Sequence, residues 1–196
     1  MTGLDAIVLS GGDAVRMGGA KPGLEVGGLP LLARVTAALS AADTVIVVGP
    51  TVPEARADVV CREEPAGAGP VAAVAAGMRH VRAPAVLLLA ADLPFLTADA
   101  VAALLRARGD ADRSVAVDDA GGEQPLLSAW RTDALDRALR RVDPHAGAAV
   151  RRLVAETSVL VLLPGDPPPW WDCDDLDDLA TARALATGEG GRHDVR

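Results

Sequence analysis

The feature that most constrains this chain is an apolar run that ends in a glycine-rich loop carrying two cations. Residues 6–9 (AIVL) have the pattern of a buried strand, and the loop after them begins with Gly11-Gly12 and contains Arg16 and Lys21. Glycines let backbone N–H groups approach phosphate oxygens, and nearby cations neutralise the phosphate charge. The stretch therefore predicts a site for a polyanion such as a nucleotide phosphate chain.

Apolar runs alternate with helical patterns through the rest of the first half. Strands are expected at 44–48, 59–62 and 85–89, and helices at 30–39, 70–81 and 98–108, the last with Thr97 as its N-cap. This alternation predicts an α/β fold of three layers, a Rossmann-like, mostly parallel sheet with helices on both faces. Ligands of such sheets bind outside the carboxyl ends of the strands, so Gly11-Gly12 and Asp92 should share one rim.

The second half departs from this alternation. Segments 114–117 and 125–130 flank a turn cluster and predict a small β excursion, either a hairpin or a wider one. The remaining elements are expected as helices at 133–141, 146–155 and 175–186 and a strand at 159–163. The length of 196 residues and the lack of a long linker predict one domain over residues 1–187, followed by a flexible tail, residues 188–196.

Composition excludes several classes of function. The formal net charge of −8 argues against a nucleic-acid or membrane-surface binder, which would carry a basic patch. No apolar run approaches the roughly 20 residues of a membrane span, and no signal peptide opens the sequence. The two cysteines, Cys61 and Cys173, form no C-x-x-C pair, so neither a zinc site nor a disulfide framework is expected. These features predict a cytoplasmic protein.

The glycine loop is neither a P-loop nor a dinucleotide fingerprint, because neither glycine spacing occurs. Its residues instead resemble the signature of the nucleotidyltransferase family that includes molybdenum cofactor guanylyltransferase: Leu9-Ser10-Gly11-Gly12, Arg16-Met17-Gly18-Gly19, Lys21 and Gly28-Leu29-Pro30-Leu31. In that family the matching lysine neutralises the triphosphate. The segment Gly19-Ala20-Lys21 is one residue shorter here than in the family's pattern.

The resemblance extends to acidic segments farther along the chain. Asp92 follows the most apolar strand, where a carboxylate is costly without a partner; a loop hydrogen bond would supply one, but in the family the matching Asp holds Mg²⁺ on the nucleotide phosphates. Glu64 matches an acid near the nucleoside. Asp172 and Asp174 match the family's pair before the last helix, and Asp174 is the candidate second metal ligand.

The resemblance implies that the protein moves GMP from Mg-GTP to the terminal phosphate of molybdopterin and releases pyrophosphate. The implied catalytic residues are Arg16, Lys21 and Asp92. The implied nucleotide contacts are Leu9, Ser10, Gly11, Gly12, Lys21, Glu64 and Asp92, with Asp92 and Asp174 on the metal. Transient contact with cofactor-synthesis or acceptor proteins would fit this activity.

Two alternatives stay open from the sequence. One is nucleotidyl transfer from CTP or another nucleotide to a different acceptor, such as a sugar phosphate. Guanylyl enzymes often carry an Asn just after the second strand, and Gly49-Pro50 stands there instead. The other alternative is a nucleotide-binding protein that assists cofactor maturation without catalysis.

Overall fold

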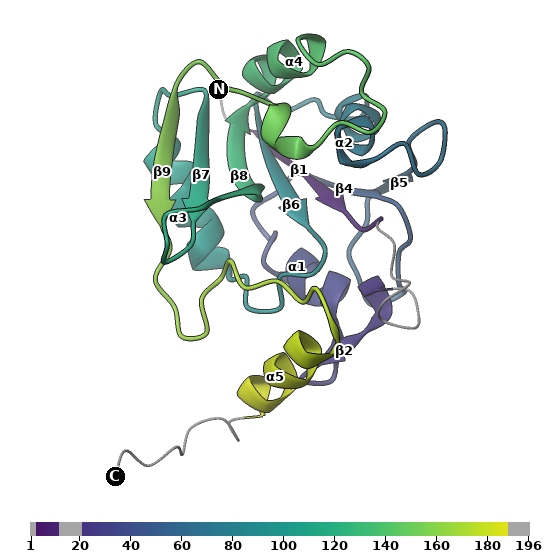
Figure 1. Ribbon diagram of the computed structural model, residues 1–196, viewed down its shortest axis with the longest axis vertical. Helices are drawn as coiled ribbons and strands as arrows, with labels where there is room; N and C mark the ends of the chain where they lie inside the picture. The colour runs from purple at the N-terminus through teal and green to yellow at the C-terminus, as the bar shows by residue number, and fades with distance from the viewer. Residues whose placement is uncertain (1–2, 12–20, 188–196) are drawn as a thin grey trace.

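The computed structural model describes residues 3–11 and 21–187, and the statements on structure below refer to these residues. Seven strands form one sheet in the order β5-β4-β1-β6-β8-β7-β9 (Figure 1). Their bounds are β1 Leu4–Leu9, β4 Thr44–Val48, β5 Val59–Cys61, β6 Ala85–Ala90, β7 Arg113–Val117, β8 Glu123–Arg131 and β9 Ser158–Leu162. Of these, β8 alone runs against the others, so the predicted mostly parallel sheet is confirmed.

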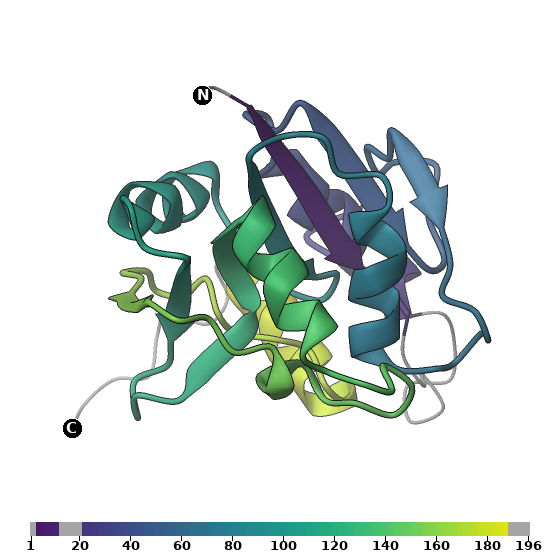
Figure 2. The ribbon, with the colours of Figure 1, turned by 90° about the horizontal axis from the view of Figure 1, so that it is seen from above.

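Helices cover both faces of the sheet, as the alternating pattern predicts. They are α1 (Leu31–Ala37), α2 (Pro70–Met78), α3 (Ala98–Arg108), α4 (Thr132–Arg140) and α5 (Leu176–Ala186). Successive side chains of a strand point to opposite faces. Along β1, Val8 therefore joins the core beneath α1 and α3, whereas Ile7 joins the core beneath α2 and α4. Figure 2 shows α2 and α4 side by side on one face.

Local signals explain several of these elements. The Thr97 side chain accepts the N–H of Ala100 and caps α3, as predicted. The expected hairpin is β7 with β8, and its register shifts between Val115 and Ala116. A short strand pair, β2 (Glu25–Val26) and β3 (Leu29–Pro30), was not expected. Gly27 and Gly28 between these two strands both have positive φ, which is the geometry of a tight two-residue hairpin turn.

The helix expected at 146–155 is wrong. The structure has only a three-residue 3-10 turn there, η3 (Val150–Arg152). Gly147 has a φ of 71°, which an α-helix cannot contain, and the chain then follows an irregular path that buries Ala148 and Leu153 in the sheet core. The apolar spacing in this stretch therefore reflects two separate anchors rather than one helical face.

The last helix returns to the start of the chain. Leu179 and Ala182 of α5 pack with Val26, Leu31 and Cys173 in a small core of their own, beside β2 (Figure 1). Asp175 caps this helix, and its side chain and that of Asp178 form a reciprocal capping box. None of the described helices is both long and apolar enough to cross a bilayer.

Candidate active site at the carboxyl edge of the sheet

A pocket of about 430 Å³ lies where the parallel strands end. Its wall includes Gly11 after β1 and Asp92 after β6, two points that are 81 positions apart in the sequence. They meet because β1 and β6 are parallel neighbours with Leu9 opposite Ala90, and the Ala91 N–H donates to the Leu9 carbonyl at 3.0 Å. The shared rim predicted from the alternation of strands and helices is therefore present.

The turn after β4 is locked against the start of the glycine loop. The Ser10 amide donates to the Val48 carbonyl at 3.0 Å, and the Ser10 hydroxyl donates to the Pro50 carbonyl at 2.5 Å. Gly49 between these carbonyls has a φ of 119°, and a Cβ there would lie 2.7 Å from the Gly11 nitrogen. Only glycine fits so close an approach, so this contact fixes the direction in which the loop leaves β1.

The Asp92 turn is held from two sides. Arg34 of α1 donates from Nε to the Pro94 carbonyl at 2.8 Å and from Nη1 to the Val26 carbonyl at 3.0 Å. The Cys173 amide donates to the Asp92 backbone carbonyl at 3.2 Å. That last bond ties the segment bearing Asp174 to the Asp92 turn, although Asp174 itself is not among the residues that line the pocket.

These two acids suit a metal that is completed by its ligand. The described residues contain no group of three or more His, Cys, Asp or Glu side chains that could hold a metal ion. Mg²⁺ on a nucleotide usually takes one or two carboxylates and fills its other positions with phosphate oxygens and water. The half-buried Asp92 on the pocket wall is a ligand of this kind, and the exposed Asp174 lies on the segment that is hydrogen-bonded to the Asp92 turn.

Of the other predicted site residues, the structure places some on the pocket wall and some away from it. Leu9 and Ser10 line the pocket with Gly11. Glu64 is exposed and outside the pocket wall, where Glu63 takes its place and accepts the Gly67 N–H at 2.9 Å. Gly12 and Arg16 lie outside the described residues, as does the side chain of Lys21. Their proposed roles stay predictions.

Arg62 lines the same pocket and was missed from the sequence. It directly follows β5, whose last residue lies beside the end of β4. The strand order could have pointed to it, since every residue directly after a parallel strand falls on this rim. A cation at this position adds positive charge to a pocket suited to phosphates.

The thiol next to Arg62 is not suited to nucleophilic catalysis. Burial raises the pKa of the Cys61 thiol; nearby Arg79 lowers this pKa and Glu63 raises it, and the net shift is upward. The thiol is therefore protonated near neutral pH, whereas the nucleophilic form of cysteine is the thiolate. This agrees with a transfer that forms no covalent enzyme intermediate.

A glycine turn and an acid that line one pocket at the carboxyl edge of a mostly parallel sheet suit an enzyme that binds a nucleotide, and the comparisons with known proteins identify its class. The model of the MobA-like NTP transferase domain matches residues 6–161. The chain belongs to this family, and it is a nucleotidyltransferase enzyme. Members of the family generally use a divalent metal.

Curated relatives match over almost their whole length. A probable molybdenum cofactor guanylyltransferase of Nostoc is 34% identical, with 92% of this chain and 90% of the relative covered. A molybdenum cofactor guanylyltransferase of Rhodopseudomonas palustris is 37% identical, with coverages of 94% and 92%. Such matches support the family assignment independently of the domain model.

Solved structures share the fold at lower identity. Molybdopterin-guanine dinucleotide biosynthesis protein A of Archaeoglobus fulgidus superposes with a TM-score of 0.67 at 19% identity, over 94% of this chain and 99% of that one. The 2-C-methyl-D-erythritol 4-phosphate cytidylyltransferase of Thermus thermophilus gives 0.70 at 21% identity, over 92% and 98%. The fold is therefore common to enzymes named for different nucleotides.

Proposed function

We propose that this enzyme transfers GMP from Mg-GTP to the terminal phosphate of molybdopterin. An oxygen of the acceptor phosphate attacks the α-phosphorus of GTP, the bond from the α-phosphorus to the bridging oxygen breaks, and pyrophosphate leaves with the electron pair. The observation that carries this proposal is the meeting of Gly11 and Asp92 in one pocket. Curated relatives named as guanylyltransferases over nearly the full chain support the choice of nucleotide and acceptor.

The chain's own residues would align the reactants rather than supply a base. An acceptor phosphate is already an anionic nucleophile, so the main task is to hold it in line with the α-phosphorus and to offset negative charge. Gly11 lets the backbone approach the phosphates, and Arg62 on the pocket wall adds charge. We assign Arg16 and Lys21 the same neutralising role on the departing pyrophosphate, following the family motif.

Asp92 and Asp174 are the residues we assign to the metal, which we take to be Mg²⁺. When bound there, the ion would draw charge from the phosphate oxygens. The tie between the Cys173 amide and the Asp92 carbonyl supports this pairing, because it keeps the two segments together before any ligand arrives.

We assign the choice of base to the part of the pocket wall that the Gly49-Pro50 turn and the Glu63 loop form. Glu64 remains our sequence-based candidate for a contact to the nucleoside, and Glu63 is a second candidate from its position. Exchanging each separately for Gln and comparing the GTP affinity of the two variants would decide between them.

The decisive experiment measures pyrophosphate release with molybdopterin and either GTP or CTP. Asp92→Asn is compared with Asp143→Asn, which removes an exposed carboxylate from a loop outside the pocket. We expect release with GTP, a fall of about 100-fold or more for Asp92→Asn, and wild-type rates for Asp143→Asn.

Each alternative gives its own result. Release with CTP and none with GTP would overturn the guanylyl assignment and leave the enzyme class intact. A metal-dependent rise in melting temperature with GTP, but no pyrophosphate with any acceptor, would favour the non-catalytic alternative. Full activity of Asp92→Asn would remove Asp92 as the metal ligand.

A further inference from the structure

A second and larger cavity lies at the opposite edge of the sheet, where the parallel strands begin. Its volume is about 1190 Å³. It is bounded by the loop before β6, the end of the antiparallel strand β8, the C-terminal ends of α2 and α3, and one side of α4 along its whole length. We call it the arginine groove, because its lining contains Arg79, Arg82, Arg108, Arg131 and Arg140.

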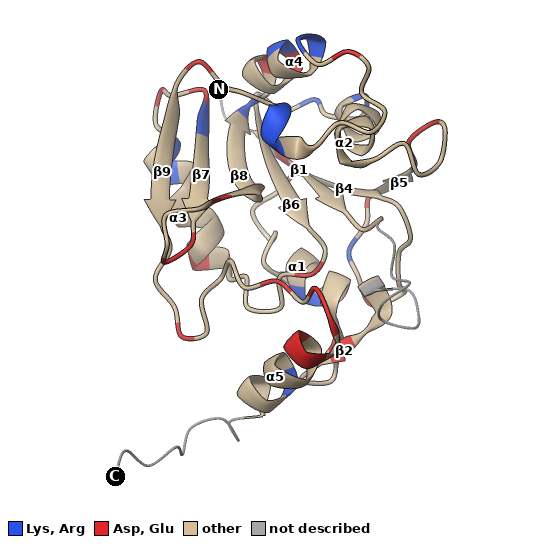
Figure 3. Ribbon diagram, viewed as in Figure 1, with Lys and Arg blue, Asp and Glu red and all other residues tan. Residues whose placement is uncertain are grey.

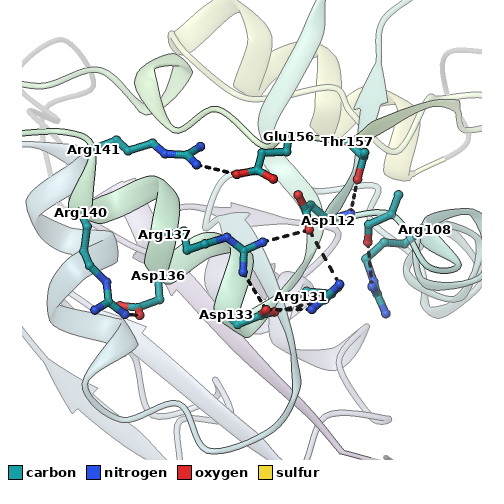
Figure 4. Close-up of polar contacts among 11 residues, drawn as sticks. Arg108, Asp112, Arg131, Asp133, Asp136, Arg137, Arg140, Arg141, Glu156 and Thr157 are labelled. Atoms are coloured by element: carbon teal, nitrogen blue, oxygen red, sulfur yellow. Dashed lines mark hydrogen bonds and ion pairs between the residues drawn. The ribbon is translucent and has the colours of Figure 1, made fainter.

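Some of these arginines already have carboxylate partners. Arg131 donates to Asp133 at 2.8 Å, and Arg140 pairs with Asp136 one helical turn away (Figure 4). Arg137, beside the groove, bridges Asp133 and the buried Asp112. The charges on this side of the groove are therefore largely neutralised within the protein.

Three arginines of the groove differ from these. In the described part of the chain, no carboxylate lies within ion-pair distance of Arg79, Arg82 or Arg108. Arg82 donates only to backbone, namely the Arg79 carbonyl at 3.0 Å and the Val81 carbonyl at 2.9 Å. Arg108 donates to the Ala111 carbonyl at 3.0 Å, and its Nε is buried without a hydrogen-bond partner.

The ends of two helices account for part of this arrangement. Arg79 and Arg82 follow α2, and Arg108 ends α3, where the helix dipole favours a cation. A guanidinium has five N–H donors, however, and the hydrogen bonds from the Arg82 side chain use Nη1 alone. Three positive charges without carboxylate partners thus gather on one groove of a protein whose net charge is −8. Figure 3 shows basic residues around α4 and the acidic start of α5 at the other end of the molecule.

The floor of the groove is apolar and firmly held. Met78, Pro84 and Leu139 contribute to it. The buried carboxylate of Asp5 accepts the N–H groups of Arg82 and Ala83 at 2.7 and 2.9 Å, which fixes the loop that carries Arg82. A partner would therefore meet a preformed surface, so little ordering cost would be added on binding.

We propose that the arginine groove docks an acidic, partly apolar segment of another protein. The apolar floor would take its aliphatic side chains, and Arg79, Arg82 and Arg108 would pair with its carboxylates. The volume of the groove, about 1190 Å³, is far larger than a small inorganic anion fills, and its lining combines these cations with apolar residues such as Met78, Pro84 and Leu139. The groove and the nucleotide pocket lie at opposite edges of the sheet, so a docked segment leaves the pocket open.

The test uses a fluorescein-labelled peptide of alternating Glu and Leu and measures its binding by fluorescence polarisation. The groove variant is Arg79→Glu with Arg82→Glu. The control is Arg151→Glu with Arg152→Glu, which changes the net charge equally at two exposed residues outside the groove. We expect the Kd to rise at least about tenfold in the groove variant and less than about threefold in the control. GTP-dependent pyrophosphate release should be unchanged in both, because neither pair touches the nucleotide pocket.

Three results would overturn the proposal. One is no binding of the peptide to the wild-type protein at concentrations up to about 1 mM. A second is an equal rise of the peptide Kd in both variants, which would mean attraction by the overall charge of the protein. The third is displacement of the peptide by inorganic pyrophosphate with a Kd similar to that of the peptide, which would mean a site for small anions. If the charge reversal unfolds the protein, Arg79→Gln with Arg82→Gln replaces it in the test. Peptide binding needs no GTP, so a negative result in this test leaves the transferase proposal untouched.

Discussion

Replacing Gly49 by Ala should damage both the stability of the protein and its nucleotide site. The φ of 119° at this residue is one that a side chain rarely adopts, at a cost of about 1–3 kcal/mol. The new Cβ would also lie 2.7 Å from the Gly11 nitrogen and 2.9 Å from the Ser10 hydroxyl. Such overpacking adds about 1–3 kcal/mol, so the free energy of unfolding should fall by about 2–6 kcal/mol unless the glycine loop moves away.

Either response has a measurable result. Urea denaturation reports the lost stability if the loop stays in place, and GTP affinity with pyrophosphate release reports the damage if it shifts. Gly121→Ala is the matched control, because its φ is 83° and nothing lies within 4 Å of its Cβ position. It should lose about 1–2 kcal/mol from backbone strain alone and keep its affinity for GTP. Equal stability losses in the two variants, combined with wild-type GTP binding by the Gly49 variant, would refute the close-approach argument.

Three further predictions concern the elements that support the site. Gly77→Ala should destabilise the protein by about 1–3 kcal/mol in urea, although Ala favours helix, because its Cβ would meet Ile7 Cγ2 at 2.9 Å; a gain in stability would contradict this packing. Thr97→Ala should cost about 1 kcal/mol and Thr97→Ser much less, because only the hydroxyl caps α3. The Val45 N–H holds the pKa of the Asp58 carboxyl below its usual 3.8, so its stabilisation is present above that pH and is lost as the pH falls through the lowered pKa. Asp58→Asn should therefore cost at most about 1 kcal/mol near pH 7 and make acid unfolding less steep.

The parallel part of the sheet could be predicted because strands such as β4 and β6 are short, apolar and bounded by turn residues. The position of β6 followed from its unbroken aliphatic run, and the start of α5 followed from the acids at Asp175 and Asp178. The first strand begins earlier than expected because it includes Asp5, whose buried carboxylate binds backbone of the loop before β6. A polar residue inside a strand gives no such signal in the sequence alone.

The candidate site likewise has a part that could be predicted from the sequence and a part that could not. The alternation of strands and helices predicted Gly11 and Asp92 on one rim, and the pairing of β1 with β6 makes them line one pocket. The hydrogen bonds from the Ser10 hydroxyl to the Pro50 carbonyl and from Arg34 to the Pro94 carbonyl could not be predicted. They depend on side-chain directions that only tertiary packing sets. The same limit explains why Glu63, rather than its neighbour, reaches the pocket wall.

The helix α2 contributes residues to both cavities, one at each of its ends. Gly69 and Pro70 at its N-terminal end line the nucleotide pocket, and Met78 with Arg79 at its C-terminal end line the arginine groove. A helix of nine residues spans about 13 Å and carries partial positive charge at its first turn and negative charge at its last. The first end therefore favours phosphates and the second favours arginines. The right-handed crossovers of a parallel sheet point every such helix the same way, so the topology that builds the nucleotide pocket also collects unpaired cations on the far edge. An acidic protein can thus present a basic docking surface without placing it beside its substrate.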